Sequence, residues 1–467
     1  MRRTLVLDIV GLTPRLVSAH TPNLKALADA GGLRPIDTVT PAVTTTVQTT
    51  YLTGLTPREH GIVANGWYFR DLSEIWFWRQ SNRLVTGERV WQTARARDPA
   101  FTCANLFWWY NMFSGADIGV TPRPMYLSDG RKIPDCYAEP PELRDELTAR
   151  LGRFPLFNFW GPMTDVSSSK WIVDCARYVL ERDRPTLTLV YIPHLDYNLQ
   201  RLGPDDPATA RDLQDVDAAV KPLLDHARAE DMDVMVVSEY GIIQVDTPIH
   251  INRALREAGM VRVRDELGQE LLDQGASRAF AVADHQLAHV YVHDPADIPR
   301  VHGILAELDG IERVLDDRGK AAYALDHPRS GELVALARSD AWFTYYYWLD
   351  DARAPDFARC VDIHRKPGFD PVEMFLDPRF ASPKLSVGWR LLKKHLGFRQ
   401  IMDVIPLDAR LVRGSHGRTT DDPDDGPVLI TSRPELLPQS GSVPATAVKD
   451  TMLAHVFPES AREALAS

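Results

Sequence analysis

Short apolar runs and amphipathic stretches alternate along the chain. The apolar run TLVLDIV is followed by TPNLKALADAGG, in which Thr21 suits a helix N-cap, Pro22 the first helical position and the paired glycines the helix end. KWIVDCARYVLERDRP has apolar positions at helical spacing and precedes TLTLVYIPHLD, which predicts a buried strand. The same order of helix and strand recurs from ARDLQDVDAAVKPLLDHARAEDM to DVMVVSEYG.

This alternation predicts an α/β fold with a central, mostly parallel sheet that is sandwiched by helices. In such sheets, ligands bind beyond the carboxyl ends of the strands. Polar residues at the ends of the apolar runs are therefore the first candidates for a functional site: Asp8, His194, Asp196 and Glu239.

Two segments interrupt the alternation. Residues 65–165 are rich in aromatic residues and prolines, whereas residues 245–335 are typical of a smaller α/β insertion. We therefore expect one core built from residues 1–244 and 336–435, with the aromatic-rich segment decorating its sheet. Residues 436–467 are expected to form a loosely held tail.

Composition and charge narrow the possible partners and compartments. The net charge of −11 is spread among mixed signs, so no basic stripe indicates a nucleic acid polymer. No run of eighteen apolar residues is present, and we expect no membrane partner.

The start, MRRTLVLDIVGL, superficially resembles a signal peptide, but Asp8 interrupts its apolar run and no small-residue cleavage site follows. Four cysteines without CxxC spacing indicate neither a zinc ribbon nor a disulfide framework. These features favour a cytoplasmic protein, and they leave the oligomeric state open.

The stretch TVTPAVTTTVQTTYLTG, residues 38–54, contains eight threonines in seventeen positions and no charge. It serves packing alone, or one of its hydroxyl groups takes part in chemistry. A carboxylate near the end of the first strand, at Asp8, costs desolvation unless a cation or hydrogen bonds compensate it. A structural or helix-capping aspartate is the alternative.

Together with HGIVAN, residues 60–65, these features resemble the type I phosphodiesterase and nucleotide pyrophosphatase group of the alkaline phosphatase superfamily. Members of that group have a threonine nucleophile nine residues before the threonine of a Thr-Gly-Leu turn, and counting back from Thr53 gives Thr44. The Phe-Pro-Asn that follows the nucleophile in the group is absent here, and Thr45 is the alternative nucleophile. The resemblance also implies that Asn65 binds phosphate.

The chemistry of a threonine hydroxyl agrees with this assignment. A free threonine is a poor nucleophile, so coordination to a metal is the expected activator. A threonine at a helix N-terminus also lies where backbone N–H groups bind phosphate.

The resemblance implies two divalent metal ions. It assigns one ion to Asp196, to Gln200 in place of the group's histidine, and to His416 in the motif GSHG. It assigns the other ion to the positions where the group has Asp, Thr, Asp and His, which here are Asp8, Thr44, Glu239 and Tyr240. The resemblance favours Zn²⁺, whereas ligands dominated by oxygen favour Mn²⁺ or Mg²⁺. A tyrosine, with a pKa near about 10, ligates reluctantly.

The stretch CVDIHRKPGFDPVEMF has no counterpart in the group's pattern. Asp362 and His364, on the same face of an extended segment, could replace the nitrogen ligand lost at Tyr240. Lys366 would suit an anionic substrate. An ordinary loop with a Pro-Gly turn is the alternative.

In ADHQLAHVYVHD, His285 and His289 stand four residues apart. Histidine pairs at that spacing on a helix can hold a metal, but no HExxH glutamate and no third ligand accompany them. Substrate contact or a structural role is the better interpretation, so both stay outside the predicted ligand set.

The sequence therefore predicts a metal-dependent phosphodiesterase or nucleotide pyrophosphatase. Its substrate would be a small-molecule phosphate ester or anhydride, and its intermediate a phospho-threonine. Phosphonate or phosphomonoester hydrolysis at the same site is one alternative. A non-catalytic relative that has lost its metal and binds a phosphorylated ligand is the alternative from another functional class.

Overall fold

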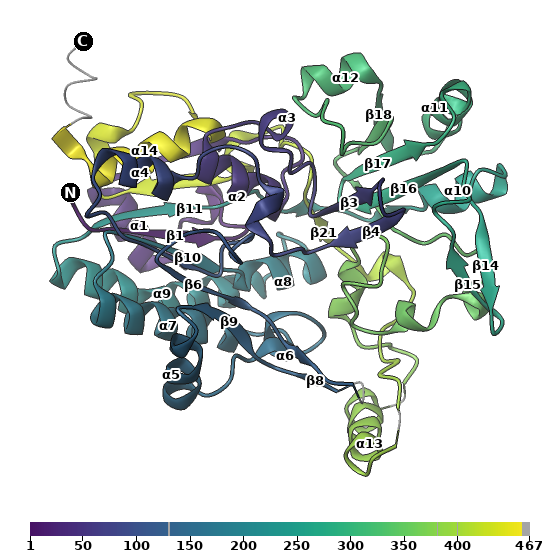
Figure 1. The fold of residues 1–467 in the computed structure, drawn as a ribbon, viewed down its shortest axis with the longest axis horizontal. Coiled ribbons are helices and arrows are strands. Elements are labelled where there is room, and N and C mark those ends of the chain that lie inside the picture. Colours follow the sequence, from purple (N-terminus) through teal and green to yellow (C-terminus); the bar gives the residue numbers. More distant parts are fainter. Residues whose placement is uncertain (129–130, 381, 399, 460–467) are drawn as a thin grey trace.

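The computed structural model describes residues 1–128, 131–380, 382–398 and 400–459. Two bodies lie side by side, with the central sheet and its helices in one and a smaller sheet in the other (Figure 1). The predicted α/β fold with a mostly parallel central sheet is confirmed.

The central sheet has nine strands in the order β23-β2-β22-β11-β1-β10-β5-β6-β9. Its strands β1, β10, β11, β5 and β6 pair in parallel, whereas β22 and β9 run antiparallel to their neighbours. The strands are β1 (Thr4–Ile9), β2 (Gly32–Asp37), β5 (Cys103–Leu106), β6 (Ile118–Pro122), β9 (Cys136–Glu139), β10 (Leu187–Ile192), β11 (Asp233–Val237), β22 (Val428–Thr431) and β23 (Val443–Pro444).

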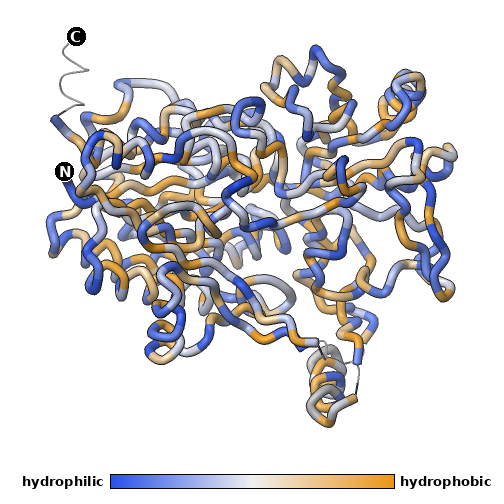
Figure 2. The backbone as a smooth tube through the Cα atoms, viewed as in Figure 1, coloured by the Kyte–Doolittle hydropathy of each residue, from blue (hydrophilic) through white to orange (hydrophobic). Residues whose placement is uncertain are grey.

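Helices cover both faces of this sheet. One face carries α7 (Ser167–Asp183), α8 (His194–Leu202) and α9 (Thr209–Ala229), and the other carries α2 (Thr44–Thr53), α4 (Val90–Arg97) and α14 (Val448–Val456) (Figure 1). Strands covered on both faces are apolar throughout, and all six residues of β1 are accordingly buried. Figure 2 shows hydrophobic residues along the central strands and hydrophilic residues on the outer helix faces. The remaining helices of this body are α1 (Pro22–Ala30), α3 (Pro57–His60), α5 (Glu142–Leu151) and α6 (Leu156–Phe159).

The smaller body is built on an antiparallel sheet in the order β16-β17-β19-β18. Its elements are α10 (Ile251–Glu257), β14 (Val263–Glu266), β15 (Gln269–Leu272), β16 (Ala279–Asp284), β17 (Leu287–Val292), α11 (Ile298–Ala306), β18 (Ile311–Leu315), α12 (Asp317–Ala322) and β19 (Leu333–Ala337). Two-stranded pairs complete the structure: β3 (Gly66–Phe69) with β4 (Glu74–Phe77), β7 (Met125–Tyr126) with β8 (Lys132–Ile133), β12 (Ile243–Gln244) with β21 (Gly414–Ser415), and β13 (Thr247–Ile249) with β20 (Ala341–Phe343). A further helix, α13 (Pro383–His395), projects away from both sheets (Figure 1).

Three boundaries differ from the sequence-based expectation. The hydrophobic core of the smaller body extends beyond residue 335 as far as Val412, and it includes Tyr68 and Phe77 from the aromatic-rich segment. That segment also supplies β5, β6 and β9 to the central sheet rather than only decorating it. The expectation of a loosely held tail is wrong for residues 436–459, because β23 pairs with β2 and α14 is buried in the main core.

Within the described ranges, no helix combines the length and the apolar character that crossing a bilayer requires.

Candidate functional site

Predicted site residues converge at the carboxyl ends of three neighbouring strands. Asp8 lies near the end of β1, Asp196 lies in the first turn of α8 directly after β10, and Glu239 follows β11. Strand β1 lies between β10 and β11, so the three carboxyl groups approach one another. Thr44 is the first residue of α2, where the N–H groups of the first turn lack helical partners. This is the geometry expected for a ligand site in an α/β sheet.

The hydroxyl of Thr44 contacts the phenol of Tyr240. Thr44 Oγ1 lies 3.1 Å from the Tyr240 hydroxyl oxygen, and that hydroxyl donates to Oδ1 of Asp196 at 3.2 Å. Tyr240 occupies the position at which the resemblance implies a histidine ligand. Here its side chain instead links the predicted nucleophile to a buried carboxylate.

Gln48 connects the carboxylates of Asp8 and Glu239. Its Nε2 donates to Asp8 Oδ2 at 3.0 Å and to Glu239 Oε1 at 2.6 Å. Its Oε1 accepts from the backbone N–H of Trp109 at 2.7 Å, which fixes the orientation of the amide. No motif in the sequence points to Gln48, although a residue four positions after Thr44 lies on the same helix face.

Asp196, Gln200 and His416 form the neighbouring part of the site. Gln200 Nε2 donates to Asp196 Oδ2 at 2.8 Å. His416 Nδ1 is 2.8 Å from the carbonyl oxygen of Ala42, so this nitrogen carries the proton and Nε2 carries a lone pair. Nε2 faces Asp196 Oδ1 at 4.0 Å. Two ligands that each lie about 2.1 Å from one ion are separated by no more than about 4.2 Å, so this spacing suits a shared cation.

Four buried acceptor atoms of the site have no hydrogen-bond partner in the described structure: Asp8 Oδ1, Glu239 Oε2, Gln200 Oε1 and His416 Nε2. Gln48 holds one oxygen of each of the Asp8 and Glu239 carboxylates, and these two groups also hydrogen-bond to one another when one of them is protonated. Buried acceptors without donors are costly unless a cation or proton satisfies them. The residues present therefore fit divalent cations at both predicted positions, with oxygen donors dominating and His416 as the single nitrogen.

Burial sets the protonation of these groups. It raises the pKa of Asp196 to about 7, and it raises the pKa of Asp8 and of Glu239, whose mutual repulsion adds to the effect at Glu239. It lowers the pKa of the His416 imidazole well below the ordinary value, which keeps this ring neutral. Bound cations would favour the ionised carboxylates.

Several other threonines of the tract stabilise the helix and its surroundings. Thr45 Oγ1 donates to the carbonyl of Ala64 at 3.0 Å, and Thr49 Oγ1 donates to the Thr45 carbonyl at 2.7 Å. Thr53 makes the equivalent bond to Thr49, so these hydroxyl groups serve the helix. Of the two candidate nucleophiles, only Thr44 has its hydroxyl at the carboxylate cluster.

Asn65 joins the site to the smaller body. Its Oδ1 accepts from the Thr45 backbone N–H at 3.0 Å, and Asp284 accepts from both its backbone N–H and its Nδ2, at 2.7 and 3.2 Å. Asp284 also contacts His285 Nδ1 at 2.7 Å. His285 lies in a tight turn with φ of 59°, and its ring stacks on that of His416 with centroids 3.7 Å apart. The spacing of four residues from His289 singles out His285 in the sequence, whereas no motif points to Asp284.

His364 and Lys366 are placed differently from the expectation. Residues 363–365 form a turn rather than an extended segment, and His364 is exposed. Lys366 is buried, and its ammonium group pairs with Asp370 and Glu373, each at 2.7 Å. His289 belongs to β17 and donates to the Val63 carbonyl at 3.0 Å, so it has a structural role.

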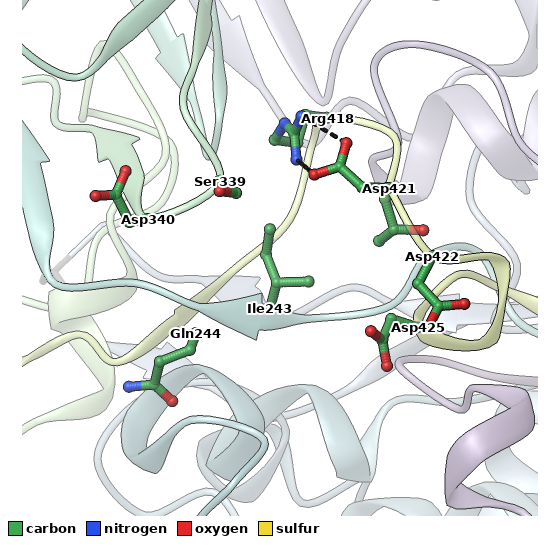
Figure 3. A pocket seen from close by; sticks show the side chains of 9 residues that line it. Ile243, Gln244, Ser339, Asp340, Arg418, Asp421, Asp422 and Asp425 are labelled. Atoms are coloured by element: carbon green, nitrogen blue, oxygen red, sulfur yellow. Dashed lines mark hydrogen bonds and ion pairs between the residues drawn. The ribbon is translucent and has the colours of Figure 1, made fainter.

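Two surface pockets lie outside the carboxylate cluster. Figure 3 shows one of about 230 Å³ in which Arg418 pairs with Asp421, beside Asp422 and Asp425. The other, about 490 Å³, contains His194, Asp212 and Asp215, whose ligand atoms lie within 4.8 Å of one another. None of the predicted catalytic or metal-binding residues lines either pocket. His194 Nε2 lies 3.4 Å from Asp212 in this second pocket. His194 is therefore part of that cluster and not of the group around Thr44.

The sequence profile of the family described as type I phosphodiesterase / nucleotide pyrophosphatase matches residues 4–370. A comparison with curated proteins finds no relative by sequence.

Solved structures with the same fold cover almost the whole chain. Phosphonoacetate hydrolase from Sinorhizobium meliloti 1021, in complex with phosphonoformate, has a TM-score of 0.63 and 16% identity over 97% of this chain and 96% of that chain. An inactive threonine-to-alanine variant of murine ectonucleotide pyrophosphatase / phosphodiesterase 5, in complex with AMP, has a TM-score of 0.57 and 13% identity over 98% and 95%. The human ectonucleotide pyrophosphatase / phosphodiesterase 5 has a TM-score of 0.58 and 12% identity over 98% and 95%.

Proposed function

Because this chain belongs to the type I phosphodiesterase and nucleotide pyrophosphatase family, we propose that it hydrolyses small-molecule phosphate diesters or anhydrides with Thr44 as nucleophile. The family places it among hydrolases of phosphoric ester or anhydride bonds. The set of four unpartnered buried acceptors around Thr44 carries the proposal, since such a set suits cations that would bind and activate a phosphate.

Two groups of residues would hold the ions. Asp8, Glu239 and Thr44 offer oxygen atoms for one ion, and Asp196, Gln200 and His416 offer two oxygens and a nitrogen for the other. When bound, divalent ions supply positive charge that stabilises an alkoxide nucleophile and the charge on the transferred phosphoryl group. The family resemblance favours Zn²⁺, and the oxygen-rich donor set favours Mn²⁺ or Mg²⁺.

The protein's own groups can orient Thr44 and accept its proton. Because the Tyr240 hydroxyl donates to Asp196, its oxygen is free to accept the hydrogen of Thr44. A proton leaving Thr44 Oγ1 can pass to the Tyr240 oxygen as the phenol proton passes to Asp196 Oδ1. Burial raises the pKa of Asp196 to about 7, and a cation held by this carboxylate would lower that pKa and keep the group ionised as a hydrogen-bond acceptor.

Asn65 and the first turn of α2 would position the phosphate. The N–H groups at this N-terminus favour an anion next to the nucleophile. Asn65 is held by Asp284, so its amide is fixed before a substrate arrives. Attack by Thr44 would expel the leaving group and produce a phospho-threonine, which water then hydrolyses.

Nitrophenyl substrates test the proposal. We expect nitrophenol release from bis-nitrophenyl phosphate, loss of this activity after chelation, and its return with Zn²⁺, Mn²⁺ or Mg²⁺. The murine relative is inactive as a threonine-to-alanine variant, and we expect the same of Thr44→Ala. No release from diester or monoester, together with no bound metal, would favour the non-catalytic alternative.

Phosphonate or monoester hydrolysis is the second candidate. The observation in its favour is the fold shared with phosphonoacetate hydrolase over 97% of this chain. Comparing kcat/KM for phosphonoacetate, mono-nitrophenyl phosphate and bis-nitrophenyl phosphate under identical metal conditions separates the candidates.

A further inference from the structure

Helix α13 exposes an apolar stripe to solvent. Of the sixteen exposed large hydrophobic side chains found in the described residues, seven lie between Leu385 and Ile401. The four that define the stripe are Leu385, Trp389, Leu392 and Leu396, exposed by 75, 58, 46 and 63%. Their spacing of four, three and four residues places them on one face of a helix. A contiguous apolar patch of this kind marks an interaction surface.

The opposite face attaches the helix to the protein. Val387 packs against the core of the smaller body, and Arg390 pairs with Asp403 at 2.7 Å. The Arg390 guanidinium also lies over the ring of Phe380, 4.9 Å from its centroid. The stripe faces outward while Val387 and Arg390 hold another side of the helix, and α13 projects beyond both bodies (Figure 1).

The charge of this segment is opposite to that of the whole chain. Residues 377–403 contain six lysines and arginines and two aspartates, whereas the net charge of the chain is −11. The two aspartates, Asp377 and Asp403, pair with Arg379 and Arg390. Lys393 lies beside the stripe, with its ammonium group 5.5 Å from the centre of the Trp389 ring. Apolar Leu and Trp residues flanked by basic residues are typical of a helix that lies in the interface of an anionic membrane.

We propose that α13 and the turn that follows it form a membrane-surface anchor that inserts Leu385, Trp389, Leu392 and Leu396 into the headgroup region of an anionic bilayer. The helix would lie parallel to the membrane plane, with Lys393 facing lipid headgroups. The exposed Phe398 and Ile401, 64 and 51% accessible, extend the apolar surface past the end of the helix.

Vesicle co-sedimentation of the full-length protein tests this assignment. We expect binding to phosphatidylcholine vesicles that contain phosphatidylglycerol, weaker binding as salt is raised, and little binding to phosphatidylcholine alone. The variant Leu385→Ser/Leu392→Ser/Leu396→Ser should bind at least about tenfold more weakly. These side chains are exposed, so its far-UV circular dichroism and thermal unfolding should match those of the wild type.

A matched variant controls for the loss of exposed leucines. Leu72→Ser/Leu267→Ser/Leu349→Ser removes three leucines that are exposed elsewhere, by 53, 105 and 49%, and should bind vesicles like the wild type. Equal loss in both triple variants, equal binding to neutral and anionic vesicles, or no vesicle binding would overturn the proposal. So would concentration-dependent self-association that depends on the stripe and occurs without vesicle binding, since a second copy would then be the partner.

Discussion

Thr44 and Thr45 are adjacent in the chain, but their hydroxyl groups have different partners. Thr44 Oγ1 contacts Tyr240, whereas Thr45 Oγ1 donates to the Ala64 carbonyl. If Thr44 is the nucleophile, Thr44→Ala should lower kcat by at least about a thousandfold and leave the unfolding free energy nearly unchanged. Thr45→Ala should keep its activity and lose about 1 kcal/mol of stability with its hydrogen bond. Steady-state kinetics and urea unfolding measure both effects.

Thr44→Ser serves as the conservative control, because it keeps the hydroxyl and should retain measurable turnover. Full activity in Thr44→Ala with an inactive Thr45→Ala would move the nucleophile by one position. Full activity in both variants would exclude a nucleophile from this helix terminus.

Gln48 is expected to control metal affinity without touching a metal. In Gln48→Met, which conserves volume, Asp8 and Glu239 lose the donor that orients them. Loss of such an outer hydrogen bond typically weakens metal binding by about 10- to 100-fold. Titration calorimetry on chelator-treated protein measures the effect, with Gln214→Met on the exposed face of α9 as the control.

The cluster of His194, Asp212 and Asp215 could take up a cation of its own and obscure this result. Asp212→Asn in both backgrounds removes that contribution. Unchanged metal affinity in Gln48→Met, measured in the Asp212→Asn background, would contradict the role assigned to Gln48.

At the scale of elements, the strands that were easiest to predict are those with the most uniform environment. Strands β1, β10 and β11 are covered on both faces, so they appear in the sequence as mostly apolar runs that begin or end next to amphipathic helices. Strands β5, β6 and β9 are short and lie among aromatic residues and prolines, which hid their period. Helix α14 was missed because only tertiary packing, not local pattern, shows that the segment is held.

That packing leads to a prediction for α14. Met452 is fully buried in the main core, so Met452→Ala should cost about 2–5 kcal/mol of unfolding free energy. Asp450→Ala, on the exposed side of the same helix, should change stability by less than about 0.5 kcal/mol. Urea unfolding measures the unfolding free energy of both variants. Equally small losses in the two variants would indicate that the C-terminal segment is loosely held.

At the scale of the whole molecule, part of the site could be predicted because the spacing of the family's motifs assigns five residues. These are Asp8, Thr44, Asp196, Glu239 and His416, and they lie close to one another in the structure. The roles of Gln48, Asp284 and His285 depend on contacts between segments far apart in the chain, and no local pattern encodes those contacts. For the same reason, the ion pairs that occupy Lys366 could not be foreseen from its neighbours in sequence.

Two buried neutral histidines accept hydrogen bonds from backbone N–H groups. His60 Nδ1 accepts from the Ile62 N–H at 3.0 Å, and His289 Nδ1 accepts from the Gly331 N–H at 3.2 Å. Protonation would break these bonds, and burial lowers the pKa of His60 to about 3 and of His289 to about 4. In the unfolded chain, both titrate near about 6.5.

The sign of the pH effect follows from these values. Between pH 6.5 and the native pKa, the unfolded state binds a proton that the native state excludes, so each histidine contributes stability that is lost as pH falls. Between pH 7 and pH 5 the loss is about 2 kcal/mol per histidine. The free-energy cost of His60→Gln should therefore be about 2 kcal/mol smaller at pH 5 than at pH 7. Urea unfolding of wild type and variants at both pH values measures the difference, and a pH-independent cost of His60→Gln would show that His60 is protonated in the native state.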